Sequence, residues 1–225
     1  MKINDEALLS RCISQFNLLK IFSEEKPPTF ELFQFQKGDL MLRSGEVSDY
    51  FFFLIDGQLK VYNYSPGGKI IFLSQLVPFQ VIGEIASLWG WEATANVEAN
   101  SKVLCIGIHL DSHRNDLLND LDFLRFLCQK MALKTISNNK YFSSTIFDSL
   151  DSRLAALVVN NAADGKVEPK LSEWAELLYI TYRHLLRTLN KFVEKGILAK
   201  QGRYYILIDQ EILKEMAHPN FPKLK

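Results

Sequence analysis

The sequence predicts an α+β fold in which strands come first and helices follow. Three observations support this prediction. Residues 30–108 consist of short apolar runs separated by glycine turns, residues 111–147 contain neither Gly nor Pro, and residues 148–208 contain three helical segments followed by a hairpin. We therefore expect an N-terminal antiparallel β-roll of the jelly-roll type, a long connecting helix and a small, mainly helical C-terminal domain.

The turns of the expected roll recur at intervals that suit short strands. The runs DYFFFLI, QLKVYNY and KIIFLSQL are rich in aromatic and β-branched residues, which favour strands. Asp56-Gly57 and Gly67-Gly68 lie between these runs and predict hairpin turns, because glycine accepts a positive φ angle without steric cost. With an N-terminal helix before the strands, we expect this domain to span residues 1–116 as an antiparallel sandwich or barrel.

The segment from Asp111 to Phe147 predicts one long helix. Its apolar residues follow a 4-3-4-3 spacing typical of a seam between partner helices, and Asn138 on that seam would fix the register. Phe123, Phe126 and Leu127 form a second apolar face that would cover the sheet. The alternative is that the seam itself lies on the sheet of its own domain. We place the dimerisation helix at residues 117–147, with the seam residues Leu117, Leu121, Leu124, Cys128, Met131, Thr135, Asn138 and Phe142.

Residues 148–225 are expected to form the C-terminal domain. The segments DSRLAALVVNNA and 171–180 predict two helices. Thr181 is a good N-cap for a third helix, Tyr182 to Lys195, which Gly196 would close. The segment ILAKQGRYYILI that follows predicts two strands joined around a Gln-Gly turn. Three helices followed by such a hairpin are typical of a winged helix-turn-helix.

The third helix and the hairpin are basic, although the chain as a whole is neutral. Between Thr181 and Ile208 there are six cations and one anion. Arg183, Arg187 and Lys191 follow each other at i, i+4 and i+8 and therefore share one side of the helix. Such a segment is typical of a contact with nucleic acid, and a solvated basic helix face is the alternative.

A helix of this kind fits the major groove of DNA, where its N-terminal residues reach the base edges. Arginine favours guanine because its fork bonds O6 and N7 together, whereas cations further along the helix meet phosphates. We predict that double-stranded DNA is contacted by Thr181, Tyr182, Arg183, His184, Arg187 and Lys191, and by Arg203 at the tip of the wing.

Two blocks of the sequence, in the same order, resemble the CRP/FNR superfamily of bacterial transcription regulators. The first runs from Gly38-Asp39 through DYFFFLIDGQLKVY to IGEIASL and is similar to a β-roll of the cyclic nucleotide-binding type. The second runs from DSRLAALVV through LSEWAELLYITYRHLLRTLNKFVEKG to the hairpin. The resemblance implies a homodimer on a palindromic DNA site, with RNA polymerase as a further partner. It also implies a sensor domain in which a small molecule shifts the population between two dimer geometries.

The recognition helix departs from the usual pattern of the family, which opens with Ser/Thr-Arg-Glu-Thr and places an Arg later. Thr181 and Arg187 match, but Tyr182-Arg183 replaces the Arg-Glu pair. Because a carboxylate that accepts from cytosine N4 is lost and a guanine-favouring fork is gained, we expect a different operator. Tyr179 occupies the turn position where glycine is common, so the turn is of another type or Tyr179 is strained.

The resemblance also places an effector pocket in the roll. In members that bind cyclic nucleotides, the Glu of a Gly-Glu pair accepts from the ribose hydroxyl and a later Arg holds the phosphate. No basic residue occurs from Ile70 to Ser101, so we predict that neither cAMP nor cGMP binds with useful affinity. Another small molecule, or no ligand at all, remains open. The pocket candidates are Gly83 and Glu84, which match, Ile85, Ala93 or Thr94 at the Arg position, and Asn138.

No cofactor, metal site or catalytic residue is expected. Cys12, Cys105 and Cys128 are too few and too scattered for an iron–sulfur cluster, and we expect inert packed thiols rather than a redox switch. His109 and His113 do not suffice to predict haem. A metal-dependent, cupin-like enzyme is the less favoured alternative, because no His-x-His pair is present. A protein-binding β-roll without DNA binding is the other alternative.

The sequence offers no signal for a membrane. No apolar run approaches the roughly 20 residues that span a bilayer. The start MKINDEALLSRC lacks the apolar core of a signal peptide, so we expect a cytoplasmic protein.

Overall fold

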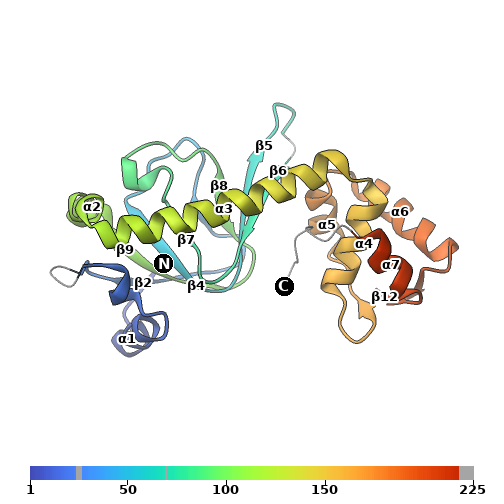
Figure 1. Cartoon of the computed structure of the whole chain (residues 1–225), viewed down its shortest axis with the longest axis horizontal. Helices are drawn as coiled ribbons and strands as arrows, with labels where there is room; N and C mark the ends of the chain where they lie inside the picture. Colours follow the sequence, from blue (N-terminus) through green and yellow to red (C-terminus); the bar gives the residue numbers. More distant parts are fainter. Residues whose placement is uncertain (24–26, 69, 218–225) are drawn as a thin grey trace. The chain divides into compact units, whose positions relative to one another are not determined.

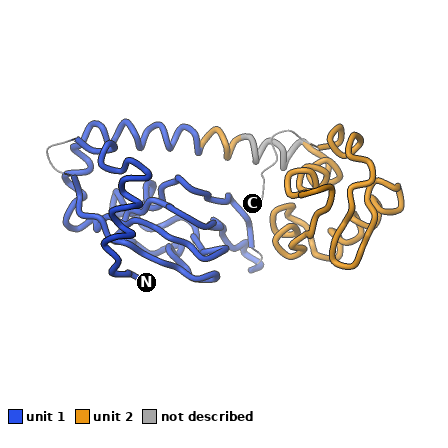
Figure 2. The backbone as a smooth tube through the Cα atoms, turned by 90° about the horizontal axis from the view of Figure 1, so that it is seen from below, with its two compact units in different colours: residues 1–134 blue, residues 135–225 orange. Residues whose placement is uncertain are grey.

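The computed structural model describes residues 1–23, 27–68 and 70–217, and of residues 140–147 it describes the backbone only. The chain divides into two compact units, Met1–Lys134 and Thr135–Lys225 (Figure 2). The first unit is built on two antiparallel sheets, and the second combines helices with a small sheet (Figure 1). The predicted α+β fold class is confirmed.

Unit 1 contains the β-roll. Its strands are β1 (Lys2–Ile3), β2 (Glu31–Phe35), β3 (Leu40–Leu42), β4 (Tyr50–Asp56), β5 (Leu59–Tyr64), β6 (Ile70–Leu76), β7 (Val81–Ile82), β8 (Asn96–Ala99) and β9 (Val103–His109). One sheet has the order β1-β2-β9-β4-β7 and the other the order β3-β8-β5-β6. Neighbouring strands are antiparallel in both sheets, as the sequence predicts.

Strand β4 lies between two hydrophobic cores. Phe51 and Phe53 belong to a core between the five-stranded sheet and the helices of unit 1, whereas Phe52 and Leu54 belong to a core between the two sheets. Successive side chains of a strand point to opposite faces, so a run of five buried residues is what a strand covered on both faces requires. The apolar run DYFFFLI is therefore the sequence pattern of a strand that is covered on both faces.

One of the two predicted hairpins is wrong. Gly67-Gly68 joins β5 to β6, which pair with each other, so this hairpin is confirmed. Asp56-Gly57 instead carries the chain from β4 in one sheet to β5 in the other. Gly57 has a φ of +89°, and a Cβ atom there would lie 2.3 Å from the carbonyl oxygen of Lys102. The glycine is needed for a crossing between sheets rather than for a hairpin.

The helices of unit 1 cover the outer face of the five-stranded sheet (Figure 1). They are α1 (Glu6–Gln15), the first part of α3 (Leu121–Phe147), α2 (Leu110–Asn119) and the short 3-10 helix η1 (Leu18–Ile21), while a second 3-10 helix, η2 (Ser87–Trp89), follows β7. Phe123 is fully buried with its ring centre 5.4 Å from that of Phe51, and Phe126 lies 6.1 Å from Phe53. The predicted second apolar face of α3 is therefore confirmed.

The prediction of one unbroken helix from Asp111 is wrong, because the chain leaves the helical conformation at Asp120. The carboxylate of Asp120 accepts from the backbone N–H groups of Asp122 and Phe123 at 2.9 and 3.1 Å, as an N-cap does. It also accepts from the N–H and hydroxyl of Ser23 at 2.8 and 3.1 Å. Burial acts to raise the pKa of Asp120, but these hydrogen bonds outweigh burial and lower it. Helix α3 consequently begins at Leu121, and Leu117 lies on α2.

Unit 2 has the predicted outline of three helices and a hairpin. The elements are α4 (Leu150–Asn161), β10 (Lys166–Val167), α5 (Leu171–Leu177), α6 (Tyr182–Glu194), β11 (Leu198–Gln201), β12 (Tyr204–Leu207) and α7 (Gln210–Met216). The sheet has the order β10-β12-β11, so the hairpin gains a third strand that the sequence did not reveal. Trp174, Leu154, Phe192 and Leu213 lie in the core of the unit, each at most 2% exposed.

Candidate nucleic-acid interface and effector pocket

Helix α6 begins at Tyr182, as the sequence predicts, and ends at Glu194, one residue before the predicted end. The hydroxyl of Thr181 accepts from the backbone N–H of His184 at 3.2 Å, which caps the N-terminus. Gly196 follows the C-terminus with a φ of +70°, a conformation that glycine adopts without strain. Leu185, Leu189 and Phe192 are fully buried, so the inner face of α6 fixes its orientation in unit 2.

All of the residues predicted to contact DNA are exposed. Five of them lie at the N-cap or in the first two turns of α6, the sixth lies in its last turn, and the seventh lies in the turn between β11 and β12. They are Thr181, Tyr182, Arg183, His184, Arg187, Lys191 and Arg203. The structure therefore brings the helix residues together on one outward surface of unit 2.

The cations of this surface differ in their partners. Lys191 pairs with Asp151 in the first turn of α4, and Arg203 pairs with Glu168 at 3.1 Å while its guanidinium lies 5.3 Å from the ring centre of Tyr204. Within the described part of the chain, Arg183 and Arg187 have no ion-pair partner. Among the cations predicted to contact DNA, Arg183 and Arg187 are thus the two that no described carboxylate neutralises.

The turn before α6 is strained, as one of the two interpretations of Tyr179 predicts. Tyr179 has a φ of 56°, in the left-handed region that costs a non-glycine residue about 1–2 kcal/mol. Its N–H donates to the carbonyl of Glu176 at 3.1 Å, and Nη1 of Arg153 on α4 donates to the carbonyl of Leu178 at 3.2 Å. This turn ends α5 at Leu177, before the predicted end at Ile180.

The effector-pocket candidates do not all lie together. Gly83 has a φ of +94°, and a Cβ atom there would lie 2.9 Å from both the Ser87 hydroxyl and the Tyr50 carbonyl. Glu84 is buried, whereas the neighbouring Ile85 is 48% exposed. Ala93 is buried and donates its N–H to the carbonyl of Glu46 at 2.8 Å.

The other two pocket candidates lie elsewhere. Thr94 is exposed, and its carbonyl accepts from Asn63 at 2.9 Å. Asn138 lies on the part of α3 that belongs to unit 2, whereas the other candidates belong to unit 1.

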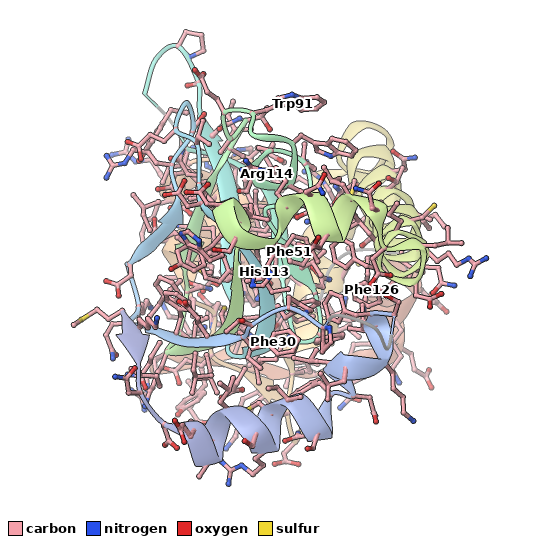
Figure 3. The ribbon with its side chains drawn as sticks, turned by 90° about the vertical axis from the view of Figure 1, so that its left-hand side faces the viewer. Phe30, Phe51, Trp91, His113, Arg114 and Phe126 are labelled. Carbon is pink, nitrogen blue, oxygen red and sulfur yellow. The ribbon has the colours of Figure 1, made fainter. Side chains whose placement is uncertain are left out.

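Three basic residues that the sequence analysis missed contact the loop around Gly83. Lys134 on α3 pairs with Glu84, and Lys130 donates from Nζ to the carbonyl of Phe79 at 2.8 Å. Arg114 on α2 donates to the carbonyl of Ser87 at 3.3 Å, beneath Trp91 at the edge of the unit (Figure 3). These cations follow the loop in sequence by tens of residues, so no local spacing relates them to it. The one signal in the sequence was the i, i+4 spacing of Lys130 and Lys134, which places both lysines on the same side of a helix.

Three of the eight residues of the predicted dimer seam pack against the core of unit 1. Leu117 is 2% exposed in the core of unit 1, so its assignment to the seam is wrong. Leu124 and Met131 are half-buried against the same core. The accessible residues of the predicted seam are Leu121, which is 59% exposed, Cys128, Thr135 and the half-exposed Asn138. The side chain of Phe142 lies outside the described residues. Leu133 and Ile136, which the spacing did not select, are 63% and 53% exposed.

The cysteines and histidines form no metal site within the described ranges, where no group of three or more His, Cys, Asp or Glu residues could hold an ion. Cys12 and Cys105 are buried, and burial raises the pKa of both thiols, as expected for packed cysteines. Cys128 is exposed on α3, contrary to that expectation. His113 accepts from the backbone N–H of Thr29 at 3.2 Å.

Among the residues that the structure describes, no helix is long and apolar enough to cross a membrane.

Comparison with known proteins finds one family match and relatives that cover most of the chain. Residues 32–118 match the cyclic nucleotide-binding domain family. The chain is 27% identical over 194 residues to the regulatory protein YeiL of Escherichia coli O157:H7, covering 86% of this chain and 89% of the relative. It is 21% identical over 193 residues to a CRP-like cAMP-activated global transcriptional regulator of Mycobacterium tuberculosis, covering 81% of this chain and 86% of the relative.

Solved structures of transcription regulators share the fold. A CRP-family regulator from Thermus thermophilus aligns with a TM-score of 0.69 at 19% identity, covering 86% of this chain and 98% of that chain. A putative regulator of the CRP/FNR family from Eubacterium rectale aligns with a TM-score of 0.71 at 15% identity, covering 95% of this chain and 94% of that chain. The family match, the curated relatives and the shared fold together show that the chain is similar to transcription regulators of the CRP/FNR superfamily, as the resemblance in the sequence predicts.

Proposed function

We propose that this regulator is a sequence-specific DNA-binding protein that acts as a homodimer on a palindromic site. The observation that supports the proposal most directly is the outward surface of α6, where Arg183 and Arg187 are exposed and no described carboxylate pairs with them. Arginines in this position are available to guanine edges in the major groove. The relatives named above are regulators, and we propose no catalytic role for this chain.

We assign two roles to the cations of this surface: some contact base edges, and others contact phosphates and orient the protein on DNA. Arg183 and Arg187 lie near the N-terminus of α6 and are placed to reach base edges. Lys191 and Arg203 are partly neutralised by Asp151 and Glu168, so each would exchange a protein carboxylate for a phosphate on binding DNA. These two cations therefore add orientation and less affinity than unpaired cations would.

The exposed side of α3 supports the homodimer. Leu121, Leu133 and Ile136 are large apolar residues that are more than half exposed on this helix. A second copy of the chain that packed against this side would cover them and place two recognition helices on one DNA duplex. RNA polymerase is the further partner that we propose for a regulator of this type, which would act in the cytoplasm.

The proposal does not include a cyclic nucleotide. The mycobacterial relative is described as cAMP-activated, but this chain has no basic residue from Ile70 to Ser101 that could hold a cyclic phosphate. An iron–sulfur cluster and haem are not proposed either. Isothermal calorimetry with cAMP and cGMP tests this part, and micromolar binding of either compound would contradict it.

Selection of bound fragments from random DNA, followed by gel-shift titration in a series of salt concentrations, tests the main proposal. We expect a palindromic consensus and an affinity that falls steeply as salt rises, because bound phosphates release counterions. Absence of salt-sensitive DNA binding would favour the alternative function, a β-roll that binds only protein.

A further inference from the structure

Helix α3 holds the segment from Phe79 to Glu84 with two lysines that are one helical turn apart. The Nζ of Lys130 donates to the carbonyl of Phe79 and lies 4.7 Å from the centre of the Phe79 ring. The Nζ of Lys134 pairs with Oε1 of Glu84. Both lysines and the segment belong to unit 1, so these contacts lie within one compact body. Helix α3 therefore contacts both ends of the segment, Phe79 through Lys130 and Glu84 through Lys134.

The pair between Lys134 and Glu84 is largely shielded from water. The side chain of Glu84 is 3% exposed and that of Lys134 is 20% exposed. A carboxylate in such a position is strongly destabilised unless a cation compensates it, and removal of one partner leaves the other charge uncompensated. Shielding also protects the pair from screening by salt. The pair accordingly has a much larger influence on this segment than a surface ion pair would have.

The backbone fixes the direction in which Glu84 points. Gly83 adopts a φ of +94° and has no space for a Cβ atom, because the Ser87 hydroxyl and the Tyr50 carbonyl would each lie 2.9 Å away. The N–H of Leu88 donates to the carbonyl of Gly83 at 3.0 Å. Glu84 thus leaves a constrained turn, and Lys134 meets its carboxylate in a defined position.

The same carboxylate is the one that the family resemblance assigns to a ribose hydroxyl. In this chain, Oε1 of Glu84 already has an ammonium partner from α3. A nucleotide would have to displace that cation and offer a neutral hydroxyl in its place, which compensates a buried charge less well. The segment from Ile70 to Ser101 also contains no arginine of its own that would repay the exchange through a phosphate.

We propose that the Lys134–Glu84 pair is an internal latch that takes the place of a ligand in the β-roll. It fixes the segment Phe79–Glu84 against α3 and makes DNA binding independent of a small molecule. The part that concerns DNA rests on the function proposed above. The latch itself is a property of unit 1 and is measured without DNA.

The first experiment follows the loop in the ligand-free protein. Trp89 and Trp91 are 49% and 62% exposed on this loop, whereas Trp174, the third tryptophan, is 2% exposed, so acrylamide quenching reports mainly on the loop. In Glu84→Gln and in Lys134→Met we expect stronger quenching. We also expect amide hydrogen exchange in residues 83–91 to accelerate at least about tenfold, as local opening becomes easier.

A matched control breaks another ion pair of the roll. Lys60 and Glu98 pair at 3.4 Å on the four-stranded sheet, with side chains that are 16% and 23% exposed. Glu98→Gln removes a carboxylate from a partly shielded pair of the same roll that does not involve α3. We expect quenching and exchange at residues 83–91 to stay at the wild-type level in this variant. Unchanged behaviour in both Glu84→Gln and Lys134→Met would overturn the latch, whether or not the protein binds DNA.

The second experiment measures affinity for a DNA fragment selected with the wild-type protein. After extensive dialysis, the wild type is expected to bind equally well with and without saturating cAMP. Glu84→Gln and Lys134→Met are expected to lose about tenfold, within the usual range of coupling between sites. The double variant Glu84→Lys with Lys134→Glu is expected to recover part of that loss.

The outcomes separate the two proposals. If the loop loosens in the single variants while their DNA affinity stays at the wild-type level, the latch has no regulatory role and the inference is overturned. If the wild type binds no DNA although the loop responds as expected, the proposed function fails and the latch remains.

Discussion

Arg183 and Lys191 lie on one side of α6 but in different electrostatic surroundings. Arg183 is exposed and has no ion-pair partner among the residues that the structure describes, whereas Lys191 pairs with Asp151. A contact between Lys191 and a phosphate must therefore first break the pair with Asp151. At the scale of single residues, the two cations should therefore contribute differently to DNA binding, and the pair with Asp151 adds a reason that the sequence did not reveal.

Arg183→Ala should relax base preference at one position of each half-site, at a cost of about 1–3 kcal/mol. Lys191→Ala should weaken binding to all fragments similarly and by a smaller factor, because Asp151 already offsets its charge. Binding curves for a set of fragments that vary one base at a time measure both effects. If Arg183→Ala lowers affinity for all fragments equally, Arg183 contacts only phosphate.

Gly57→Ala should destabilise unit 1 far more than Gly38→Ala. Both glycines have a positive φ, +89° and +93°, so alanine costs about 1–2 kcal/mol at either position from backbone strain. At Gly57 the new Cβ atom would also lie 2.3 Å from the Lys102 carbonyl, whereas nothing lies within 4 Å at Gly38. Urea unfolding of the two variants measures the difference. Equal losses of stability would mean that the Lys102 backbone moves aside at little cost.

At the scale of elements, the break between α2 and α3 shows what the sequence could and could not predict. The extent of the helical region followed from the absence of Gly and Pro over residues 111–147. The break depends on Asp120, whose partner Ser23 lies almost one hundred residues earlier and is invisible to any local pattern. Asp120 is a good N-cap residue, and this was the local signal that could have placed the start of α3.

Asp120→Asn should reduce the dependence of stability on pH. The hydrogen bonds hold the folded pKa of Asp120 below its unfolded value of about 3.9. Its contribution is therefore fully present above that unfolded value and is lost as pH falls through the folded pKa. Asparagine keeps an acceptor oxygen but does not titrate, so unfolding curves between neutral pH and pH 3 should change less in the variant. Parallel curves for variant and wild type would show that other carboxylates dominate.

The two candidate sites also show that a local sequence pattern does not reveal partners from distant parts of the chain. The exposed basic side of α6 could be predicted because α6 is one continuous helix, whose period places Arg183, Arg187 and Lys191 on one side. The environment of Glu84 could not be predicted, because Lys134 reaches it from a helix that the chain enters much later. Sites built within one element can be read from spacing, whereas sites built between elements require the fold. Strand β10 and helix α7 were missed because both are short.

At the scale of the whole molecule, one helix contributes residues to both units. Helix α3 buries Phe123 and Leu127 in unit 1, exposes Leu133, and continues into unit 2 at Thr135. The 4-3-4-3 spacing grouped residues from two sides of this helix that face different surroundings. Leu124 and Met131 turn towards the core of unit 1, and Leu121 turns to the surface. The homodimer proposed above would therefore use a surface shifted around the helix from the predicted seam.

Leu133→Glu should weaken the homodimer at least about tenfold, because it places a charge in the apolar centre of the proposed interface. Val47→Glu is the matched control, since Val47 is 51% exposed on unit 1 and lies outside α3. Sedimentation velocity over a range of protein concentrations measures the dissociation constant of each variant. A dimer that resists Leu133→Glu would require another interface.

The order of strands in the five-stranded sheet has a consequence for synthesis on the ribosome. Strand β9 lies between β2 and β4, although it is the last strand of unit 1 to be made. Until residue 109 has left the exit tunnel, β2 and β4 lack the strand that joins them, and their apolar faces stay open. Unit 1 should therefore remain a substrate for chaperones during most of its translation and should close in a single late step.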